Sequence, residues 1–318
     1  MSALAQEQER KQSIQFKQVL AATDFSTASA GALSFALAIA RRYGSMLSVV
    51  HAVPSEPREP IPLEPLPREL NRRRLEADQQ MKAIDYEVQK CNIRHRLLVT
   101  QGRVWDVLAG VIRCESIDLL VMGTHGRGGL SKAILGSVAE EVLRLAPCPV
   151  LTIGPHVPAT NTKAGEFQRI LYATDFGTAA TRALPYALGL AENYGAKLVL
   201  VHMVPPMPGP DIGPAAYGPS SYGAQEFIQW ERTARDESRE KLAQLIPPNA
   251  GLASPPECVA GMDFLPEGIL EVAASRRIDL IVMGAHHTSS PRLAAHLPWA
   301  LAHEIISHAK CPVLTVSD

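Results

Sequence analysis

A chain of 318 residues is about twice the length of a typical domain, and its 46% hydrophobic and 20% charged residues are ordinary for a globular protein. The formal net charge of -1 excludes an overall field that would steer the chain toward nucleic acid or an anionic membrane. No apolar run approaches the roughly 18 residues of a membrane span, and the polar first residues do not resemble a secretory signal. We therefore expect a cytoplasmic protein without nucleic-acid or membrane partners.

The 5 cysteines show neither a C-x-x-C pair nor a metal-ligand spacing. An odd number without such spacing indicates neither a disulfide framework nor a zinc site. We expect them to be small, buried, apolar side chains. They are Cys91, Cys114, Cys148, Cys258 and Cys311.

In chain order, short β-branched apolar runs alternate with longer stretches of helical period. Strands are predicted at Val19–Ala22, Leu47–Ala52, Arg96–Thr100, Leu119–Met122 and Pro149–Ile153. Helices are predicted at Thr27–Tyr43, closed by Gly44, and at Arg68–Lys90, Val104–Cys114 and Ser137–Leu145. Strands that are apolar on both faces and alternate with helices are typical of a parallel sheet covered on both sides.

The second half of the chain repeats the first. "VLAATDFSTASAGALSFALAIARRYG" from Val19 matches "ILYATDFGTAATRALPYALGLAENYG" from Ile170, "IDLLVMGTH" matches "IDLIVMGAH", and "CPVLTI" matches "CPVLTV". The fold class predicted is α/β, with two tandem doubly wound domains of five parallel strands each, at residues 1–155 and 166–318. Two segments rich in proline and glycine, Pro54–Pro67 and Pro205–Gly223, are predicted to be loops, as mobile insertions or as a lid over a ligand.

Ligands of an open parallel sheet bind beyond the carboxyl ends of its strands, where the crossover direction reverses. The residues after the first strand, from Ala22 to Ser26, and those after the fourth strand should therefore lie at one edge. Glycines follow the fourth strand, where a positive φ and a missing Cβ would let backbone N–H groups approach an anion. They are Gly123, Gly126, Gly128 and Gly129.

Gly136-Ser137 begins the next predicted helix, and a helix N-terminus offers N–H groups and a positive dipole end to the same anion. Ser137 with Glu140 could equally form a capping box that stabilises the helix by itself. Arg127 and Lys132 lie within reach of a polyphosphate but could equally be solvated surface groups. The pattern matches neither the P-loop nor the dinucleotide fingerprint.

The spacing of Gly123, Gly126, Gly136 and Ser137 resembles that of the universal stress protein (UspA-like) family, whose ATP-binding members carry Gly, two residues, Gly, nine residues, Gly, then Ser or Thr. The resemblance covers nearly the whole chain as two family domains. It implies a Rossmann-like, adenine nucleotide alpha hydrolase-like fold and ATP as the ligand, with Mg²⁺ held mostly by the phosphates.

The resemblance implies an ATP site in the first domain. Its residues would be Ala22, Asp24, Ala52, Met122, Gly123, His125, Gly126, Gly136, Ser137 and Val138. Asp24 would bind the ribose hydroxyls, the Ala52 backbone would meet the adenine, and the last three residues would hold the phosphates. Two alternatives stay open, since Asp24 could be a loop or cap residue and His125 a packed loop histidine.

The second copy departs from this pattern. It keeps Asp175, Met283, Gly284 and His286, but His287 stands at the position of Gly126. Leu297-Pro298, or Trp299-Ala300 with a two-residue insertion, stands where the first copy has Gly136-Ser137. Bulky side chains there would keep the backbone away from phosphate, so we expect the second domain to lack the phosphate site.

The sequence shows no Ser-His-Asp arrangement, no pair of carboxylates at a recognisable spacing and no metal cluster. It therefore identifies no general base, and we predict no catalytic and no metal-binding residue. We expect a cytoplasmic, ATP-binding stress-response sensor or regulator that works through nucleotide-dependent conformation or assembly, with slow ATP hydrolysis or self-phosphorylation left open. The alternative is a low-turnover ATPase or adenylate-transferring enzyme on the same scaffold. "CPVLTI" and "CPVLTV" would pair as the terminal strands of a pseudo-dimer, and whole chains could form a homodimer.

Overall fold

The computed structural model describes residues 14–54, 66–125, 135–158, 164–204, 224–262, 265–285 and 298–317. The chain divides into two compact units. Ile14–Glu166 together with Ala285–Asp318 forms the larger unit, and Phe167–Gly284 forms the smaller unit. The last helix and strand of the second sequence repeat therefore group with the first repeat.

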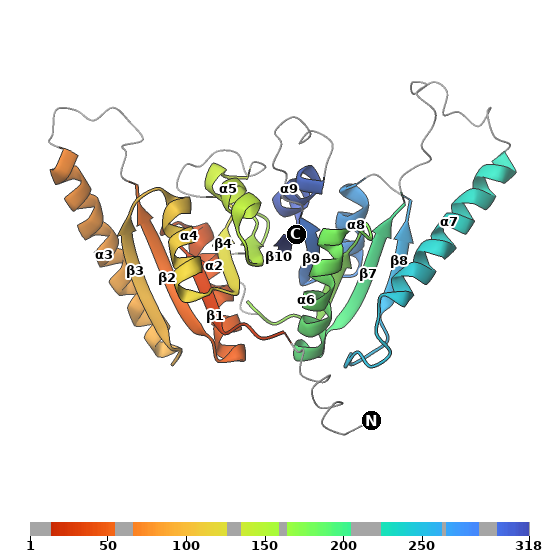
Figure 1. Cartoon of the computed structure of the whole chain (residues 1–318), viewed down its shortest axis with the longest axis horizontal. Helices are drawn as coiled ribbons and strands as arrows, with labels where there is room; N and C mark the ends of the chain where they lie inside the picture. The colour runs from red at the N-terminus through yellow and green to blue at the C-terminus, as the bar shows by residue number, and fades with distance from the viewer. Residues whose placement is uncertain are drawn as a thin grey trace. The chain divides into compact units, whose positions relative to one another are not determined.

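Figure 1 labels the helices and strands in chain order. The strands of the first repeat are β1 (Gln18–Ala22), β2 (Met46–Val53), β3 (His95–Gln101), β4 (Leu119–Gly123) and β5 (Val150–Ile153). Its helices are α2 (Thr27–Tyr43), α3 (Leu66–Lys90), α4 (Val104–Glu115) and α5 (Ser137–Leu145). The strands of the second repeat are β6 (Arg169–Ala173), β7 (Lys197–Met203), β8 (Glu257–Gly261), β9 (Leu280–Ala285) and β10 (Val313–Ser317). Its helices are α6 (Thr178–Tyr194), α7 (Ala224–Gln244), α8 (Glu267–Ser275) and α9 (Pro298–His308).

The strand order of the larger unit is β3-β2-β1-β4-β5-β10. Its neighbouring strands run parallel from β3 to β5, and β10 joins β5 in the antiparallel direction. The smaller unit has the parallel order β9-β6-β7-β8. The crossover direction reverses between β1 and β4, and again between β6 and β9, which marks the place where such sheets bind ligands.

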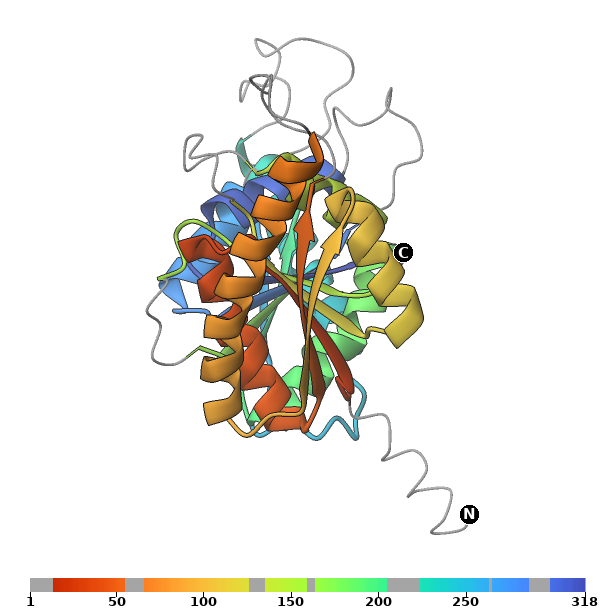
Figure 2. The same ribbon diagram turned by 90° about the vertical axis from the view of Figure 1, so that its left-hand side faces the viewer.

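Helices cover both faces of the first-repeat sheet. Viewed along the larger unit, α2 and α3 lie on one face and α4 on the other (Figure 2). The strands between them carry fully buried leucines, such as Leu20, Leu47 and Leu120. Burial on both faces is the reason that these strands are continuously apolar in sequence. The α/β class and the tandem, doubly wound architecture predicted from the sequence are confirmed, with one antiparallel pairing, between β5 and β10, beside the predicted parallel ones.

Helix α2 illustrates how local sequence sets its bounds. Ser26 is its N-cap, with an extended backbone, and its side chain accepts the Ser29 N–H at 3.2 Å. The helix ends at Gly44, whose φ of 66° lies in the left-handed region that glycine adopts without a steric penalty. These bounds are the predicted ones.

Of the two predicted loops, the structure corrects the bounds of one and does not describe the other. Helix α3 begins at Leu66, inside the segment predicted as a loop, since proline is tolerated in the first turn of a helix. The other predicted loop, Pro205–Gly223, lies outside the described residues. None of the described helices combines the length and the apolarity needed to cross a bilayer.

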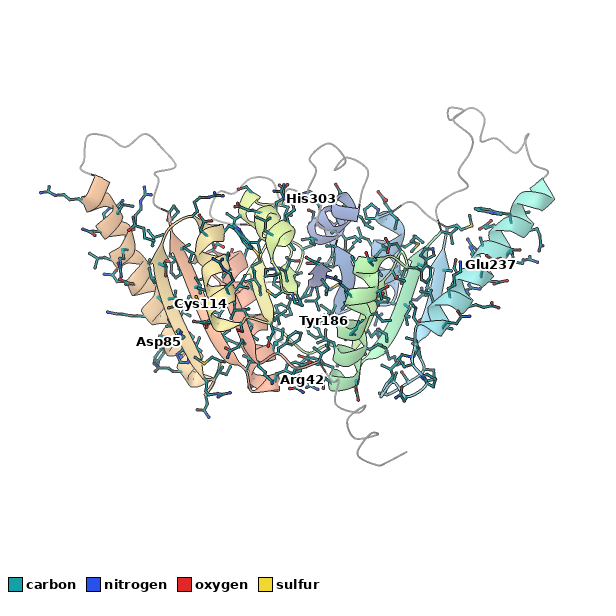
Figure 3. All side chains as sticks on the ribbon, in the orientation of Figure 1. Arg42, Asp85, Cys114, Tyr186, Glu237 and His303 are labelled. Atoms are coloured by element: carbon teal, nitrogen blue, oxygen red, sulfur yellow. The ribbon has the colours of Figure 1, made fainter. Side chains whose placement is uncertain are left out.

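The cysteines are free, but they are not uniformly buried. Cys148 and Cys311 are buried as expected, and burial raises the pKa of the Cys148 thiol to about 12. Cys91 and Cys258 are partly buried, and Cys114 is exposed on α4 (Figure 3). The prediction is wrong for Cys114 because this residue lies off the stripe of Leu108 and Ile112 that α4 buries.

Candidate functional site

The chain leaves β1 in a tight turn at the carboxyl edge of the sheet. Asp24 Oδ1 accepts the Ser26 N–H at 3.0 Å and the Ser26 hydroxyl at 2.5 Å. Asp24 is thus a turn residue, which was one of the two interpretations left open by the sequence. Because these bonds fix the carboxylate, they also set the direction in which it could meet a ligand. Its ribose role stays a prediction.

Phe25, the next residue, has a φ of 63°, which is unusual for a residue other than glycine. Its N–H donates to Thr23 Oγ1 at 3.0 Å, and its ring lies against that of His51 with centroids 4.3 Å apart. His51 Nδ1 also lies 2.7 Å from the Thr23 carbonyl oxygen. Sequence reasoning missed His51, although the second repeat keeps a histidine, His202, at the matching place.

Three predicted site residues lie at the ends of adjacent strands. Ala22 is the last residue of β1, while Ala52 and Met122 are the last but one of β2 and β4. Both β2 and β4 pair with β1, so the structure brings the three to one edge of the sheet. The Ala52 and Met122 side chains are buried, which suits contacts made by the backbone rather than by side chains.

Gly123 has a structural reason to be glycine. Its φ lies outside the positive range expected from the sequence, and a Cβ built on it would come within 3.0 Å of the Ala28 backbone in α2. The matching Gly284 approaches the Ala179 and Ala180 backbone in the same way. The expectation of positive φ is therefore wrong for Gly123, because close helix packing is what excludes a side chain.

Gly136 joins helix α5 to the end of β4. Its N–H donates to the Thr124 carbonyl at 2.9 Å, and Thr124 N–H donates in turn to the Ile153 carbonyl at 3.2 Å. The Gly136 amide is thus paired within the protein, and the place of Gly136 in a phosphate site stays a prediction. A Cβ at Gly136 would lie 3.1 Å from the Thr124 carbonyl oxygen, so this contact also favours glycine.

The start of α5 differs from the capping box considered above. The N-cap is Gly136, with an extended φ of -66° and no side-chain cap, and Ser137 is the first helical residue. Ser137 therefore does not cap the helix with Glu140. The first N–H groups of a helix have no partner inside it, so those of Ser137 and Val138 point out of the N-terminus. They find no acceptor among the described residues in the hydrogen bonds of the structure.

His125 follows Thr124 at the same edge. Its Nδ1 lies 2.8 Å from Thr124 Oγ1, which itself lies 3.3 Å from the Ile153 carbonyl oxygen. These contacts support the packed-loop alternative, and the ligand contact stays a prediction. Gly126, together with Arg127, Gly128, Gly129 and Lys132, lies outside the described residues. Among the residues that the structure does describe, no group of three His, Cys, Asp or Glu side chains could hold a metal ion.

The second repeat reproduces the turn but not the helix start. Asp175 Oδ1 accepts the Gly177 N–H at 2.8 Å, and Phe176 has a φ of 62°. The ring of Phe176 lies against that of His202, with centroids 4.5 Å apart. Helix α9, in contrast, begins at Pro298, a residue that has no N–H to offer. The expected loss of the phosphate site stays a prediction, since His286, His287 and Leu297 lie outside the described residues.

An aspartate at the opposite edge of the sheet was not singled out from the sequence. Asp118 Oδ2 accepts the N–H groups of Lys17 at 2.8 Å and Gln18 at 3.2 Å, at the start of β1. Asp279 accepts those of Gln168 and Arg169 at 3.0 Å and 2.9 Å. Burial raises the pKa of Asp118, and the donated N–H groups oppose that shift. The aspartate recurs in the sequence "IDL" of both repeats, and this recurrence is the signal that could have identified it.

Comparison with known proteins agrees with this geometry. The family described as the universal stress protein family matches residues 15–154 and 166–317. A universal stress protein of Thermus aquaticus is 36% identical over 141 residues, which cover 43% of this chain and 98% of that protein. One from Methanocaldococcus jannaschii is 28% identical over 141 residues, covering 43% and 82%. The crystal structure of a universal stress protein from Archaeoglobus fulgidus covers 96% of this chain and 99% of its own, with a TM-score of 0.66 and 16% identity, which shows a common fold.

Two repeats of a doubly wound parallel sheet define a Rossmann-like α/β protein of the nucleotide alpha hydrolase type. Because the family matches both repeats over most of their length, this chain belongs to the universal stress protein family as a tandem member.

Proposed function

We propose that this universal stress protein binds one ATP, with Mg²⁺, at the carboxyl edge of the first-repeat sheet. We further propose that it acts in the cytoplasm as a stress-response sensor or regulator. The hydrogen bond from the Gly136 N–H to the Thr124 carbonyl carries this proposal. It ties the N-terminus of α5 to the end of β4, the strand beside β1, and Asp24 is the second residue after β1. A helix N-terminus and a carboxylate thus flank the topological switch point.

The start of α5 would take the phosphates. The N–H groups of Ser137 and Val138 are the first of a nine-residue helix, and the positive end of the helix dipole favours an anion there. Gly136 contributes by leaving out a side chain rather than by donating its own N–H. Glycine at this position lets a phosphate oxygen come close to the first turn.

The strand ends would take the nucleoside. A carboxylate accepts two hydroxyl donors well, so Asp24 suits the ribose diol. The backbone of Ala52, at the end of β2, is placed to read the edge of an adenine ring. The phosphates would supply most ligands of a bound Mg²⁺, whose charge would offset theirs.

Calorimetric titration of the nucleotide-free chain with ATP and Mg²⁺ tests the proposal. We expect one ATP per chain, with weaker binding of adenosine, and we expect ATP or ADP in the mass spectrum of ligand released from the purified protein. A chain that binds no adenine nucleotide would refute the proposed site. Two ATP molecules per chain at equal affinity would refute its restriction to the first repeat.

Two further measurements test the regulatory part. Steady-state ATP turnover is expected to stay below about 1 per second, and faster turnover would favour the enzyme alternative. Mass and shape in solution, measured with and without ATP, should differ if nucleotide controls conformation or assembly. If they are identical and ATP still binds, the sensor role fails while the site stands.

A further inference from the structure

The Thr23 carbonyl at the end of β1 is bound by a side chain. His51 Nδ1 lies 2.7 Å from this oxygen, and a carbonyl oxygen can only accept a hydrogen bond. Nδ1 therefore carries a proton, which fixes the tautomer of the neutral imidazole. The Thr23 N–H is still in the ladder, donating to the Val50 carbonyl at 2.9 Å. His51 thus donates a hydrogen bond to the first residue after β1, where the chain leaves the sheet.

The same imidazole supports an unusual backbone conformation. Phe25 has a φ of 63°, and a bulky residue in this left-handed region needs support from its surroundings. Two contacts supply it: the Phe25 N–H bonds Thr23 Oγ1 at 3.0 Å, and the Phe25 ring lies against the His51 ring. Thr23, Asp24, Phe25 and His51 thus form one cluster of contacts at the end of β1.

Asp24 lies between the two residues that His51 holds. Thr23 before it is bound through its carbonyl, and Phe25 after it is held through its ring. The backbone on both sides of Asp24 is therefore fixed from β2, before the Ser26 contacts orient the carboxylate itself. The direction of a ligand-facing carboxylate thus depends on a residue of the neighbouring strand.

The second repeat has the same arrangement despite local differences. His202 Nδ1 lies 2.8 Å from the Thr174 carbonyl oxygen, and its ring lies against Phe176, whose φ is 62°. Gly177 replaces Ser26 there, so the arrangement does not depend on the serine. This repeat supplies a matched control in the same molecule.

We propose that His51 is a positioning residue for nucleotide binding, acting through Asp24. This inference rests on the proposed ATP site. The Nδ1 donor fixes the orientation of the Thr23 carbonyl, and the imidazole ring fixes the position of the Phe25 ring. Together these contacts hold the Asp24 carboxylate toward the ribose hydroxyls. A preorganised carboxylate binds more tightly because less freedom is lost when the ligand arrives.

The test separates the two properties of the histidine. His51→Phe keeps a ring against Phe25 and removes the donor, whereas His51→Asn places an amide donor near the position of Nδ1 and removes the ring. We expect His51→Phe to weaken ATP binding about tenfold, and His51→Asn to recover part of that loss. His202→Phe makes the same change in the second repeat and should leave ATP affinity unchanged.

A double-mutant cycle shows whether His51 acts through the carboxylate. Asp24→Ala combined with His51→Phe should bind ATP no more weakly than Asp24→Ala alone, because the positioned group is already gone. Losses that multiply would overturn the inference, as would wild-type affinity in a folded His51→Phe protein. A loss of stability alone would be similar in His51→Phe and His202→Phe, so it cannot produce the expected difference between them.

A second readout needs no nucleotide. In the ligand-free crystal structure of His51→Phe, we expect Phe25 to leave the left-handed region, or the Asp24 carboxylate to move by about 0.5 Å or more. An unchanged turn would overturn the inference even if the wild-type chain binds ATP. If the wild-type chain binds no ATP, the proposed function fails, and this structure still decides whether His51 positions Asp24.

Discussion

Leu151 of β5 and Leu314 of β10 lie directly opposite each other in an antiparallel ladder, and they are equivalent residues of the two repeats. Both are buried, with 2% of each exposed. On either side of them, the Thr152 and Thr315 hydroxyls donate to backbone carbonyls of the opposite strand, at 3.1 Å and 3.3 Å. The ladder therefore has a local two-fold symmetry centred on the two leucines.

Leu314→Ala should lower the free energy of unfolding by about 2 to 5 kcal/mol, because it removes a buried side chain and leaves a cavity. Leu151→Ala should have a comparable effect, measured by chemical denaturation. Because the two side chains are opposite each other, the double variant should depart from the sum by about 0.5 kcal/mol or more. Strict additivity would contradict the direct contact.

Asp24→Asn should weaken ATP binding about ten- to hundredfold, because the charge that strengthens hydrogen bonds to the ribose is lost. Asparagine keeps an acceptor oxygen for the Ser26 N–H, so the turn should survive. Calorimetry measures the affinity, and circular dichroism checks the fold. Asp175→Asn is the matched control and should leave ATP affinity unchanged. Unchanged affinity of Asp24→Asn would remove Asp24 from the site.

Gly136→Leu should abolish ATP binding while sparing the binding of adenosine, because a side chain at the start of α5 excludes the phosphates. The backbone φ of -66° is accessible to leucine, so conformational strain is not expected. The Cβ contact of 3.1 Å with the Thr124 carbonyl oxygen requires a small shift, and thermal unfolding would report its cost. Normal ATP binding by the folded variant would contradict the phosphate position.

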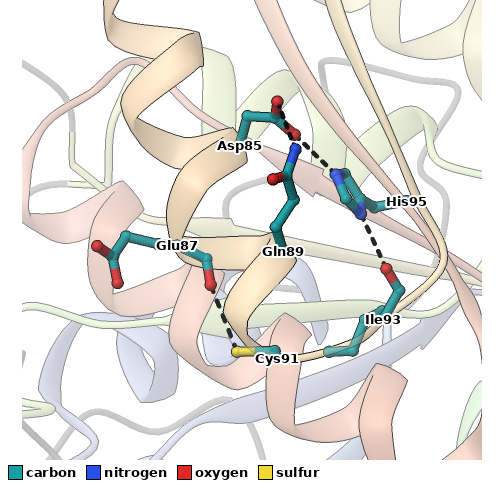
Figure 4. Close-up of polar contacts among 6 residues, drawn as sticks. All are labelled: Asp85, Glu87, Gln89, Cys91, Ile93 and His95. Atoms are coloured by element: carbon teal, nitrogen blue, oxygen red, sulfur yellow. Dashed lines mark hydrogen bonds and ion pairs between the residues drawn. The ribbon is translucent and has the colours of Figure 1, made fainter.

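The pair formed by His95 and Asp85 should make stability depend on pH (Figure 4). His95 Nε2 lies 2.8 Å from Asp85 Oδ1, and Nδ1 lies 2.8 Å from the Ile93 carbonyl oxygen. Burial lowers the pKa of His95, but the Ile93 carbonyl and the Asp85 carboxylate outweigh it and raise the pKa above the ordinary histidine value of about 6.5. The stabilisation is therefore complete below about pH 6.5 and is lost as the pH rises through the folded pKa.

Asp85→Asn tests this dependence, since it removes the charge that favours protonated His95. The wild-type chain should exceed the variant in free energy of unfolding by more at about pH 5.5 than at about pH 8.5. Denaturant titration at both pH values measures the difference. A gap that is equal at the two pH values, or larger at the higher one, would show that the ion pair does not set the dependence.

An ion pair occurs in both repeats with its charges exchanged. Arg96 of β3 pairs with Glu115 of α4 at 2.7 Å, and the equivalent Glu257 of β8 pairs with Arg276 after α8 at 2.9 Å. Arg276→Glu should cost a few tenths to about 1 kcal/mol, and Glu257→Arg in the same chain should restore it. Urea denaturation of the single and double variants checks the recovery. A double variant no more stable than Arg276→Glu would contradict the pairing.

Short-range features of the fold could be predicted from the sequence. The bounds of α2 depend on Ser26 and Gly44, which lie next to the helix and act through local geometry. The strands follow from apolar runs whose burial on both faces requires no knowledge of their partners. The start of α3 was predicted two residues too late, because Pro67 suits both a loop and the first turn of a helix.

The site was harder to predict because its key contacts join distant residues. A glycine needed for phosphate and one needed for helix packing look the same in sequence, so Gly123 could not be told apart from a ligand residue. The partner of the Gly136 N–H, and the contact between His51 and Thr23, depend on how strands lie side by side. Asp24 could be placed at the carboxyl edge of the sheet from the sequence, but the sequence could not show that Ser26 holds its carboxylate.

The carboxylates of Asp118 and Asp279 have a consequence for where the sheet should tolerate substitutions. Each bonds the first residues of the central strand at the edge opposite the candidate site. Strands anchored at one end tolerate substitutions in the loops at the other end, because those loops contribute little to holding the sheet together. Substitutions at the carboxyl edge of either repeat should therefore affect a site there more than they affect the fold, because the start of each central strand is held independently at the opposite edge.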